Sequence, residues 1–452
     1  MNSEWYYVLD ILFLSLFLGI AQYLKRTFKF FQKYLIPTSI IAGFIGMFLG
    51  PEFLNLTPFD SDRLGTIIYH LMSIGFIALT LKERNRDTGK NVVNTGFFIV
   101  STYLIQGILG FALSLLLFYT IYPDLFPPFG LLLPLGFGQG PGQAYSIGKS
   151  WEELGFSHGG NIGLSVAALG FIWACIGGVP LMNYLIKKKK MPVAITAPAA
   201  RKQKLQEVDD PDDISVGESI DKISIQLFLI GIVYLATYLS LTAADLLLTN
   251  AGTFGNTLSK LLWGFSFIIG SLFAILLRSI FDFLKRKNIM VRNYPNNYLL
   301  QRISGGAFDF MVTASIAAIS IEILSKYLVP TLIITTLGGL LTIWYVTVIS
   351  KKLFKNEVLE NLLALYGMLT GTISTGLALL REIDPNFETQ ASRNLLLGSG
   401  VGLFVGFPLM LVLNIPVVGF VSGNPLLYFL ALGILAVYFV ILLAVMLANR
   451  EK

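Results

Sequence analysis

The sequence predicts an all-α polytopic membrane protein, and two observations lead to this prediction: the composition and the recurrence of long apolar runs. Of its 452 residues, 54% are hydrophobic and 13% are charged, and the mean hydropathy is +0.70. A soluble globular protein carries about 25% charged residues, so this chain lacks the charge needed to cover a surface that faces water. The apolar runs are roughly 20 residues long, which is enough to cross a hydrocarbon core of about 30 Å.

The apolar runs predict about eleven transmembrane spans in two groups. In the first half of the chain the spans are expected at 5–24, 34–53, 64–81, 92–122 and 159–186. In the second half they are expected at 223–247, 257–284, 303–325, 328–350, 394–414 and 425–447. Two further apolar stretches, 129–150 and 357–384, are interrupted by Gly, Pro and polar residues, which predicts broken helices there.

Basic residues orient the predicted spans, because cytoplasmic loops are enriched in Lys and Arg. Basic clusters follow the spans at 25–33, 82–90, 187–204, 285–292 and 351–355. The alternate loops 54–62, 123–130 and 246–256 contain no Lys or Arg. All these basic clusters lie on the same side of the membrane if both broken stretches are re-entrant hairpins. The first hairpin would enter the membrane from the outside and the second from the cytoplasm. The N-terminus is then expected outside and the C-terminus in the cytoplasm.

The hydrophilic stretch 187–222 divides the chain into two halves. It passes from basic to acidic and contains Pro192, Pro198 and Pro211, a composition that predicts a flexible cytoplasmic linker. The expected domains are a first transmembrane repeat at 1–186, a second at 223–420, and an additional C-terminal helix within 421–452.

The two halves share an order of spans in which a broken hairpin precedes the last span. Gly178–Met182 (GVPLM) follows the first hairpin and recurs as Gly406–Met410 (GFPLM) after the second. Five spans per half is an odd number, so the second repeat is expected to be inverted relative to the first. Inverted repeats with broken segments at matching positions are typical of secondary transporters, which bind their substrates at those segments.

The sequence excludes several other classes of protein. One Cys and two His cannot build a disulfide framework or a Cys/His metal centre. No Walker motif, HExxH motif or nucleophile–base arrangement occurs, so the chain is not expected to be an enzyme or to need a cofactor, and its work must come from an ion gradient. The formal charge of +6 comes from residues beside the spans and does not indicate nucleic-acid binding.

The first hairpin, Leu135–Ala144, offers backbone groups and amide side chains. Irregular backbone at membrane depth persists only where it is buried in protein or lines a watery cavity. Carbonyl and glutamine oxygens suit a hard cation such as Na⁺, and free helix N-termini suit a carboxylate. Close helix packing by the glycines is the structural alternative. The residues expected to bind substrate or ion here are Gly138, Gln139, Gly140, Gly142 and Gln143.

In the second hairpin, Thr370–Ala378, hydroxyl groups take the place of the glutamines. Ser and Thr in membrane helices often bond back to the preceding turn, which is the structural alternative for any one of them. A candidate Na⁺ site combines Gln139 with Ser374 and Thr375. The residues expected to bind substrate or ion in this hairpin are Gly371, Thr372, Ser374, Thr375 and Gly376.

Ionisable residues inside predicted spans are functional candidates, because they are costly in a membrane. Asp309 is a candidate cation ligand or proton carrier, with a wet position near the interface as its structural alternative. Arg381 is a candidate partner for a substrate carboxylate, although such an Arg more often anchors a helix on the cytoplasmic side. For His70, helix packing is favoured over a ligand role.

On these residues the chain resembles the bacterial sodium/glutamate symporter (ESS-type) family, over nearly its whole length apart from the last helix. The five residues 138–142 read Gly-Gln-Gly-Pro-Gly where the family has a Gly-His-Gly-Thr-Gly-type sequence, so the glycines match and the polar residues differ. In the second hairpin Gly371, Thr375 and Ala378 match, whereas Leu379 stands where the family has Asn.

The resemblance implies two inverted halves of five helices, each with a re-entrant loop, and an external N-terminus. It implies alternating-access symport of an anionic amino acid, expected to be L-glutamate, with Na⁺ as the coupling ion. The expected location is the bacterial inner membrane. The expected partners are therefore the amino acid, sodium, the lipid bilayer and a second copy of the chain in a homodimer.

Two other functions stay open on the sequence. A monovalent cation/proton antiporter would use Asp309, but neither hairpin core contributes an acid. A non-transporting membrane scaffold or sensor with the same fold would not need the glycine pattern that both hairpins retain.

Overall fold

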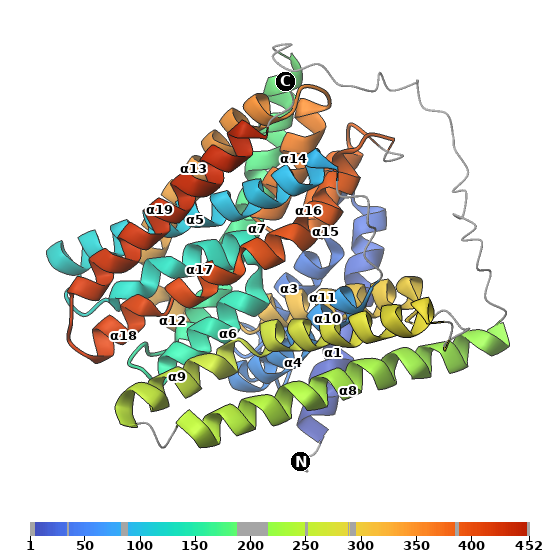
Figure 1. Ribbon diagram of the computed structural model, residues 1–452, viewed down its shortest axis with the longest axis horizontal. Coiled ribbons are helices and arrows are strands. Elements are labelled where there is room, and N and C mark those ends of the chain that lie inside the picture. Colours follow the sequence, from blue (N-terminus) through green and yellow to red (C-terminus); the bar gives the residue numbers. More distant parts are fainter. Residues whose placement is uncertain are drawn as a thin grey trace. The chain divides into compact units, whose positions relative to one another are not determined.

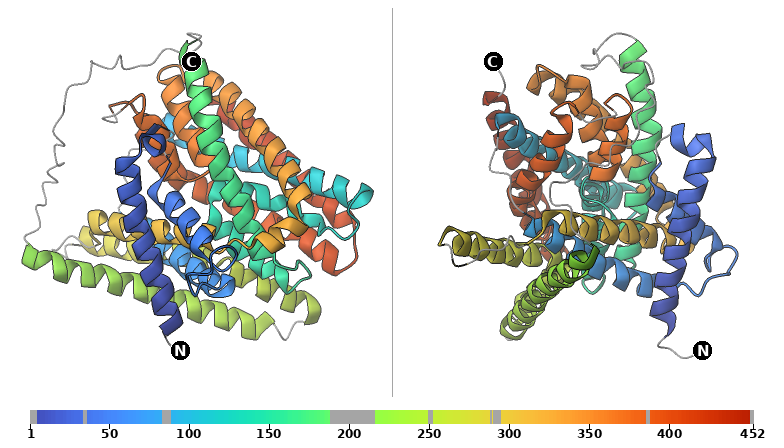
Figure 2. Two further views of the ribbon diagram at one scale, coloured as in Figure 1. Left: turned by 180° about the vertical axis from the view of Figure 1, so that it is seen from behind. Right: turned by 90° about the vertical axis from the view of Figure 1, so that its right-hand side faces the viewer.

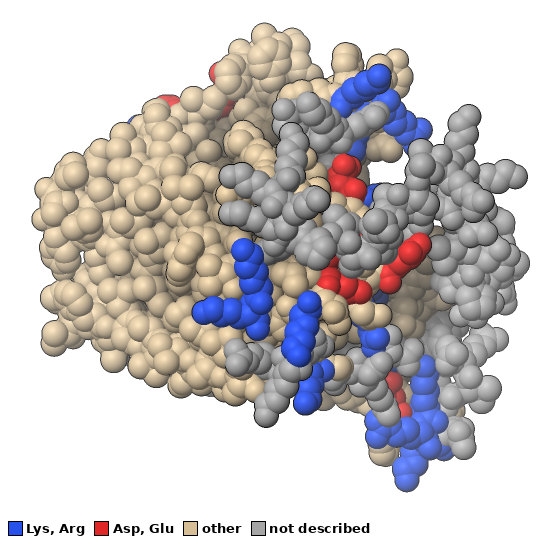
Figure 3. Space-filling model, turned by 90° about the horizontal axis from the view of Figure 1, so that it is seen from above, with Lys and Arg blue, Asp and Glu red and all other residues tan. Residues whose placement is uncertain are grey.

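The computed structural model describes residues 5–33, 36–82, 89–187, 216–248, 252–287, 289, 295–384 and 388–449, and every regular element in these ranges is a helix (Figure 1). Eight described helices are long and apolar enough to cross a membrane, or nine if one bent pair forms a single span. The face drawn in Figure 3 includes a broad area without charged side chains, as a surface in contact with lipid requires. The chain is therefore an all-helical polytopic membrane protein, as the sequence predicts.

The apolar helices follow nine of the predicted spans. The bent pair, at an angle of 46°, consists of α16 (Ala391–Val405) and the segment Phe407–Val421, and Pro408 in the first turn after the bend removes a backbone donor. That segment contains α17 (Phe407–Val412) and α18 (Ile415–Val421). The eight single helices are α1 (Trp5–Thr27), α4 (Ser61–Leu81), α5 (Lys90–Thr120), α7 (Gly159–Lys187), α8 (Val216–Leu248), α10 (Ser266–Arg286), α13 (Leu328–Leu353) and α19 (Leu426–Ala448).

Two predicted spans are wrong as full-length apolar helices. The span expected at 34–53 is α3 (Thr38–Leu49), whose 12 residues rise about 18 Å, less than a hydrocarbon core. Pro37 precedes α3 and Gly50-Pro51 follows it, and these residues end the helix. The span expected at 303–325 is α11 (Asn297–Ala317), which is not among the apolar spans and ends before a short helix, α12 (Ile321–Lys326).

The chain forms two compact units. The first consists of Met1–Tyr69, Asn85–Ile195 and Phe310–Lys452, and the second of His70–Arg84 and Thr196–Asp309. Each unit thus combines segments from both sides of the predicted linker, of which residues 188–215 lie outside the described ranges. Both hairpins belong to the first unit.

In the first unit, helices from both halves of the sequence pack together. Helix α5 packs against α13, α16 and α19 (Figure 1), and α1 packs against α3 (Figure 2). Tyr345 of α13 donates a hydrogen bond of 2.8 Å to the hydroxyl of Ser101 on α5, so a polar contact fixes the register of these two buried helices.

In the second unit, α4, α8, α10 and α11 supply one apolar core. His70 Nδ1 lies 2.5 Å from the hydroxyl of Tyr234, so this exposed histidine makes a helix–helix contact, in line with its predicted packing role. The buried core residues are Ile77, Ala78, Leu81, Leu229, Ile230, Val233, Ala274 and Leu300.

The first unit contains a partly buried ion pair that the sequence did not predict. Asp10, in α1, is fully buried, and its two oxygens accept hydrogen bonds of 2.9 and 3.1 Å from the Arg63 guanidinium at the start of α4. The same guanidinium donates to the carbonyl of Pro58 and lies over the ring of Tyr6. This two-bond geometry ties α1 to α4.

Candidate functional site

The first hairpin folds as two short helices that meet at a glycine. The π-helical element η2 (Pro134–Gln139) ends one residue before α6 (Pro141–Glu152) begins. Gly140 between them has φ +100°, a conformation that residues with a side chain rarely adopt. Pro141, which has no N–H, suits the first position of a helix. The following N–H groups of α6 have no intrahelical acceptor, and residues 139–141 are called the first break below.

Helix α6 is held in place by charged and aromatic contacts. Lys149 Nζ lies 2.9 Å from Asp62 Oδ1 in the first turn of α4 and 2.8 Å from Glu152 Oε2. The hydroxyl of Tyr145 lies 1.8 Å from the place where a Cβ on Gly65 would be, so only glycine fits at that point of α4. These contacts fix α6, and with it the first break, against α4.

The second hairpin also consists of two helices with an interruption. Helix α14 (Val358–Leu369) ends before residues 370–372, called the second break below, and α15 (Ile373–Arg381) follows. The Thr372 hydroxyl caps α15 by accepting a hydrogen bond of 3.4 Å from the backbone N–H of Thr375. The two threonine hydroxyls lie 3.2 Å apart, so they form a small polar pair at the start of α15.

The two breaks lie close to each other. A Cβ placed on Gly140 would lie 3.8 Å from Cγ2 of Thr372, which is ordinary van der Waals distance. Gly140 is the N-cap of α6 and Thr372 is the N-cap of α15, so the N-terminal ends of two helices meet at this point. Each helix N-terminus carries a partial positive charge and free N–H groups. The arrangement can therefore bind a carboxylate.

Beside the first break lie buried amide groups that have no hydrogen-bond partner among the described residues. These groups are Oε1 and Nε2 of Gln139 and Oε1 of Gln143. Leaving a buried polar group unpaired costs about 1–3 kcal/mol, so native proteins rarely leave several together. A bound ion or substrate would satisfy them, and both glutamines were singled out from the sequence.

Two residues of α5 that the sequence did not predict lie beside Gly138, next to the first break. The Tyr103 ring lies 2.3 Å from the place where a Cβ on Gly138 would be, so glycine alone allows this approach. Gln106 Oε1 lies 3.2 Å from the same place. A polar Gln inside the apolar run 92–122 was the one signal in the sequence that pointed to this helix.

Three other residues of the second hairpin differ in their hydrogen bonds and in their exposure. The Thr370 hydroxyl donates to the Tyr366 carbonyl at 2.7 Å, which is the back-bonding alternative considered for these residues. Gly376 uses its N–H within α15 and packs against α14, where a Cβ would lie 2.3 Å from the Ala364 carbonyl oxygen. Ser374 is exposed, next to the cap of α15.

Two predicted site residues are exposed side chains outside the segments 139–141 and 370–372. Arg381 is exposed in the last turn of α15, about 13 Å along the helix from Thr372. Asp309 is exposed on α11 and belongs to the second unit. Their predicted binding roles stay predictions.

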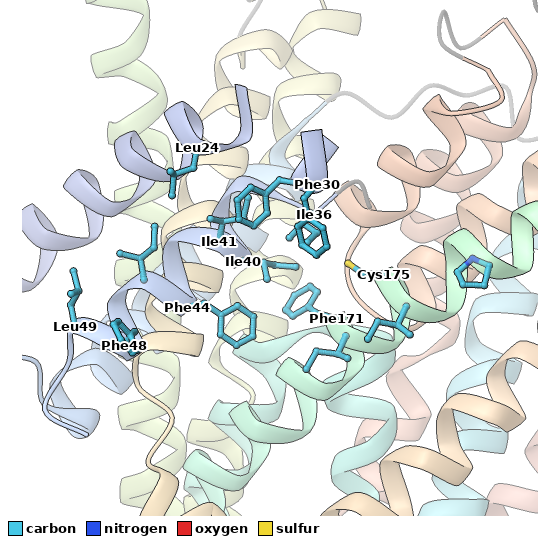
Figure 4. Close-up of a pocket in the computed structure, with 15 residues that line it drawn as sticks. Leu24, Phe30, Ile36, Ile40, Ile41, Phe44, Phe48, Leu49, Phe171 and Cys175 are labelled. Atoms are coloured by element: carbon cyan, nitrogen blue, oxygen red, sulfur yellow. The ribbon is translucent and has the colours of Figure 1, made fainter. Parts of the chain in front are cut away.

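An apolar pocket of about 850 Å³ also lies in the first unit, lined by α1, α2 (Lys29–Lys33), α3, α7 and neighbouring residues (Figure 4). The side chains drawn there are hydrocarbon apart from the sulfur of Cys175. A charged amino acid would lose its hydration in such a pocket without compensation, so its chemistry does not suit glutamate. Phe171 lines this pocket, and its ring also lies 3.1 Å from the place where a Cβ on Gly371 would be.

Comparison with known families gives one match. The family described as sodium/glutamate symporter matches residues 4–364. The matched region contains the first hairpin complete and ends within α14, before the second break. No curated protein matches the chain.

Proposed function

The chain belongs to the sodium/glutamate symporter family, and we propose that it binds L-glutamate and sodium where the first and second breaks meet. Family membership implies sodium-coupled symport of glutamate, a transport function and not a catalytic one. The observation that carries the proposed location is the close approach of Gly140 to Thr372, the N-caps of two helices.

The chemistry at the breaks suits both parts of the cargo. A substrate carboxylate accepts hydrogen bonds from the free N–H groups at the start of α6, including those of Gly142 and Gln143, and from the start of α15. Sodium binds neutral oxygens, for which Gln139, Thr375 and the neighbouring Ser374 are the proposed side-chain ligands. Gly138, Gly140 and Gly371 expose backbone groups there.

The proposed transport cycle uses the arrangement of the membrane spans. Residues 1–186 and 223–420 act as inverted repeats joined by the linker 187–222, and 421–452 adds a helix. The hairpins enter from opposite faces of a bacterial inner membrane, with the N-terminus outside and the C-terminus in the cytoplasm. Alternating access then exposes the site to one face at a time, and two copies of the chain form a homodimer.

Symport is better supported than the two alternatives. An antiporter would use Asp309 as its proton carrier, whereas the residues of both breaks, 139–141 and 370–372, are neutral. A scaffold that binds no ligand has no use for unpaired buried amides, which cost stability unless a ligand satisfies them.

Substitution of Gln139 and Thr375 tests the proposed site. Gln139→Ala and Thr375→Ala are each expected to reduce sodium-dependent glutamate uptake about tenfold or more, because each removes a ligand of a buried cation or anion. Ser399→Ala, at an exposed hydroxyl on α16 that only bonds back to its own helix, is the control and should retain uptake. Unchanged uptake in both site variants would show that this site assignment is wrong.

A further inference from the structure

Gln106 is a fully buried glutamine in α5 that joins elements from both hairpins. Its Nε2 donates hydrogen bonds of 2.9 Å to the hydroxyl of Thr342 on α13 and of 3.0 Å to the carbonyl of Leu369. Leu369 is the last residue of α14, directly before the second break. The amide nitrogen of Gln106 therefore contacts the C-terminal end of a broken helix.

Hydrogen-bond chemistry fixes the orientation of the Gln106 amide. The Thr342 hydroxyl donates its hydrogen bond to the Gly338 carbonyl at 2.7 Å. In its contact with Gln106 this hydroxyl can therefore only accept a hydrogen bond. The Leu369 carbonyl can also only accept. Both contacts therefore need the NH₂ group, and the oxygen of Gln106 must face the other way. That oxygen, Oε1, is buried and has no hydrogen-bond partner among the described residues.

The unpaired oxygen faces the first hairpin. It lies 3.2 Å from the place where a Cβ on Gly138 would be, a place that the Tyr103 ring also approaches, so Oε1 lies beside the backbone at Gly138. The next residue in the chain is Gln139, whose amide oxygen is also buried and unpaired. Two neutral acceptors with no donor thus lie beside the backbone of the first break.

We infer that Gln106 Oε1 is a ligand of the coupling sodium ion, an assignment that rests on the proposed function. An unpaired acceptor calls for a cation or an N–H donor and excludes the substrate carboxylate. The site is next to the C-terminal end of α14, where the helix dipole is negative and favours a cation. Neutral amide and carbonyl oxygens, with no carboxylate among them, are suitable ligands for a hard monovalent cation.

The test is sodium binding by the purified full-length protein in the absence of glutamate. Thermal stabilisation is measured as Na⁺ replaces K⁺ at constant ionic strength, for the wild type and for Gln106→Met, which keeps the size of the side chain. The sodium concentration at half-maximal effect is expected to rise about tenfold or more in Gln106→Met. Gln226→Met is the matched control, because Gln226 is fully buried and its Oε1 already accepts the Asn296 N–H at 3.1 Å.

Each outcome separates this inference from the proposed function. Sodium stabilisation that is equal in wild type and Gln106→Met overturns the inference and leaves the proposed function intact. If Gln106→Met raises only the KM for glutamate and leaves sodium stabilisation unchanged, the inference is also overturned. Gln106 would then bind the ammonium group of the substrate. No sodium effect in the wild type, together with no sodium-dependent uptake, would overturn the proposed function itself.

A second variant keeps the inference testable if Gln106→Met does not fold. Gln106→Glu retains an oxygen at the position and places a titratable group beside the ion. Its sodium affinity is expected to increase as the pH is raised and the carboxyl loses its proton, whereas the wild-type affinity should follow pH less closely. Equal pH dependence in both proteins overturns the inference.

Discussion

Gly140→Ala is expected to abolish glutamate uptake while leaving a folded protein. Gly140 has φ +100° and is the N-cap of α6, and a Cβ added to it would touch Thr372 of the second break. A side chain there costs about 1–3 kcal/mol in backbone strain, which the chain relieves by rotating the start of α6. Because that rotation redirects the N–H groups that would bind the carboxylate, the loss should be at least about a hundredfold.

The measurement is labelled uptake by reconstituted protein, with the yield of folded material checked by gel filtration. Gly423→Ala is the matched control, because Gly423 also has a positive φ of +64° but no heavy atom within 4 Å of a new Cβ. The control also places a side chain at a positive φ, and it should retain uptake. Equal losses in the two variants would mean that strain anywhere, and not the geometry of the first break, limits transport.

Asp10→Asn is expected to destabilise the protein by about 3 kcal/mol or more. Asp10 is fully buried and accepts two hydrogen bonds from Arg63, so its removal leaves a guanidinium without its counter-charge. The melting temperature measured by intrinsic fluorescence in detergent should fall clearly. The double variant Asp10→Leu, Arg63→Met should recover much of this loss, because it removes both charges together.

An exposed ion pair provides the comparison for Asp10. Lys326 and Glu322 lie 3.1 Å apart in α12, with 57% and 77% of their side chains exposed. Glu322→Gln should shift the melting temperature little, since solvent screens such pairs. If Glu322→Gln and Asp10→Asn shift it equally, the Asp10–Arg63 pair does not stabilise α1 against α4.

The sequence predicted the features that depend on local composition. Long apolar runs identified most spans, and the Gly and Pro residues at 138–142 identified the first break, because these residues act on the backbone wherever they stand. The span expected at 34–53 is longer than α3, and the span expected at 303–325 runs past the end of α11. Apolar residues continue beyond Pro37 and Gly50, which bound α3, and beyond Ala317, the last residue of α11.

Features that depend on distant pairing were not predictable from one sequence. Asp10 and Arg63 are 53 positions apart, and Gln106 meets Leu369 across 263 positions. Neither spacing leaves a periodic signal. The four hydroxyl residues of the second hairpin look alike in the sequence for a different reason. Their contacts are local, and composition alone does not show that Thr372 and Thr375 form the helix cap while Thr370 bonds back to its own helix.

Uptake of labelled L-glutamate into proteoliposomes tests the central claim most directly. The wild-type protein is reconstituted, and uptake is followed with an inward Na⁺ gradient, with an equal K⁺ gradient, and with no gradient. Sodium-dependent accumulation that unlabelled glutamate competes away is the predicted result. Equal accumulation under all three conditions, or none under any of them in correctly folded protein, would contradict the account.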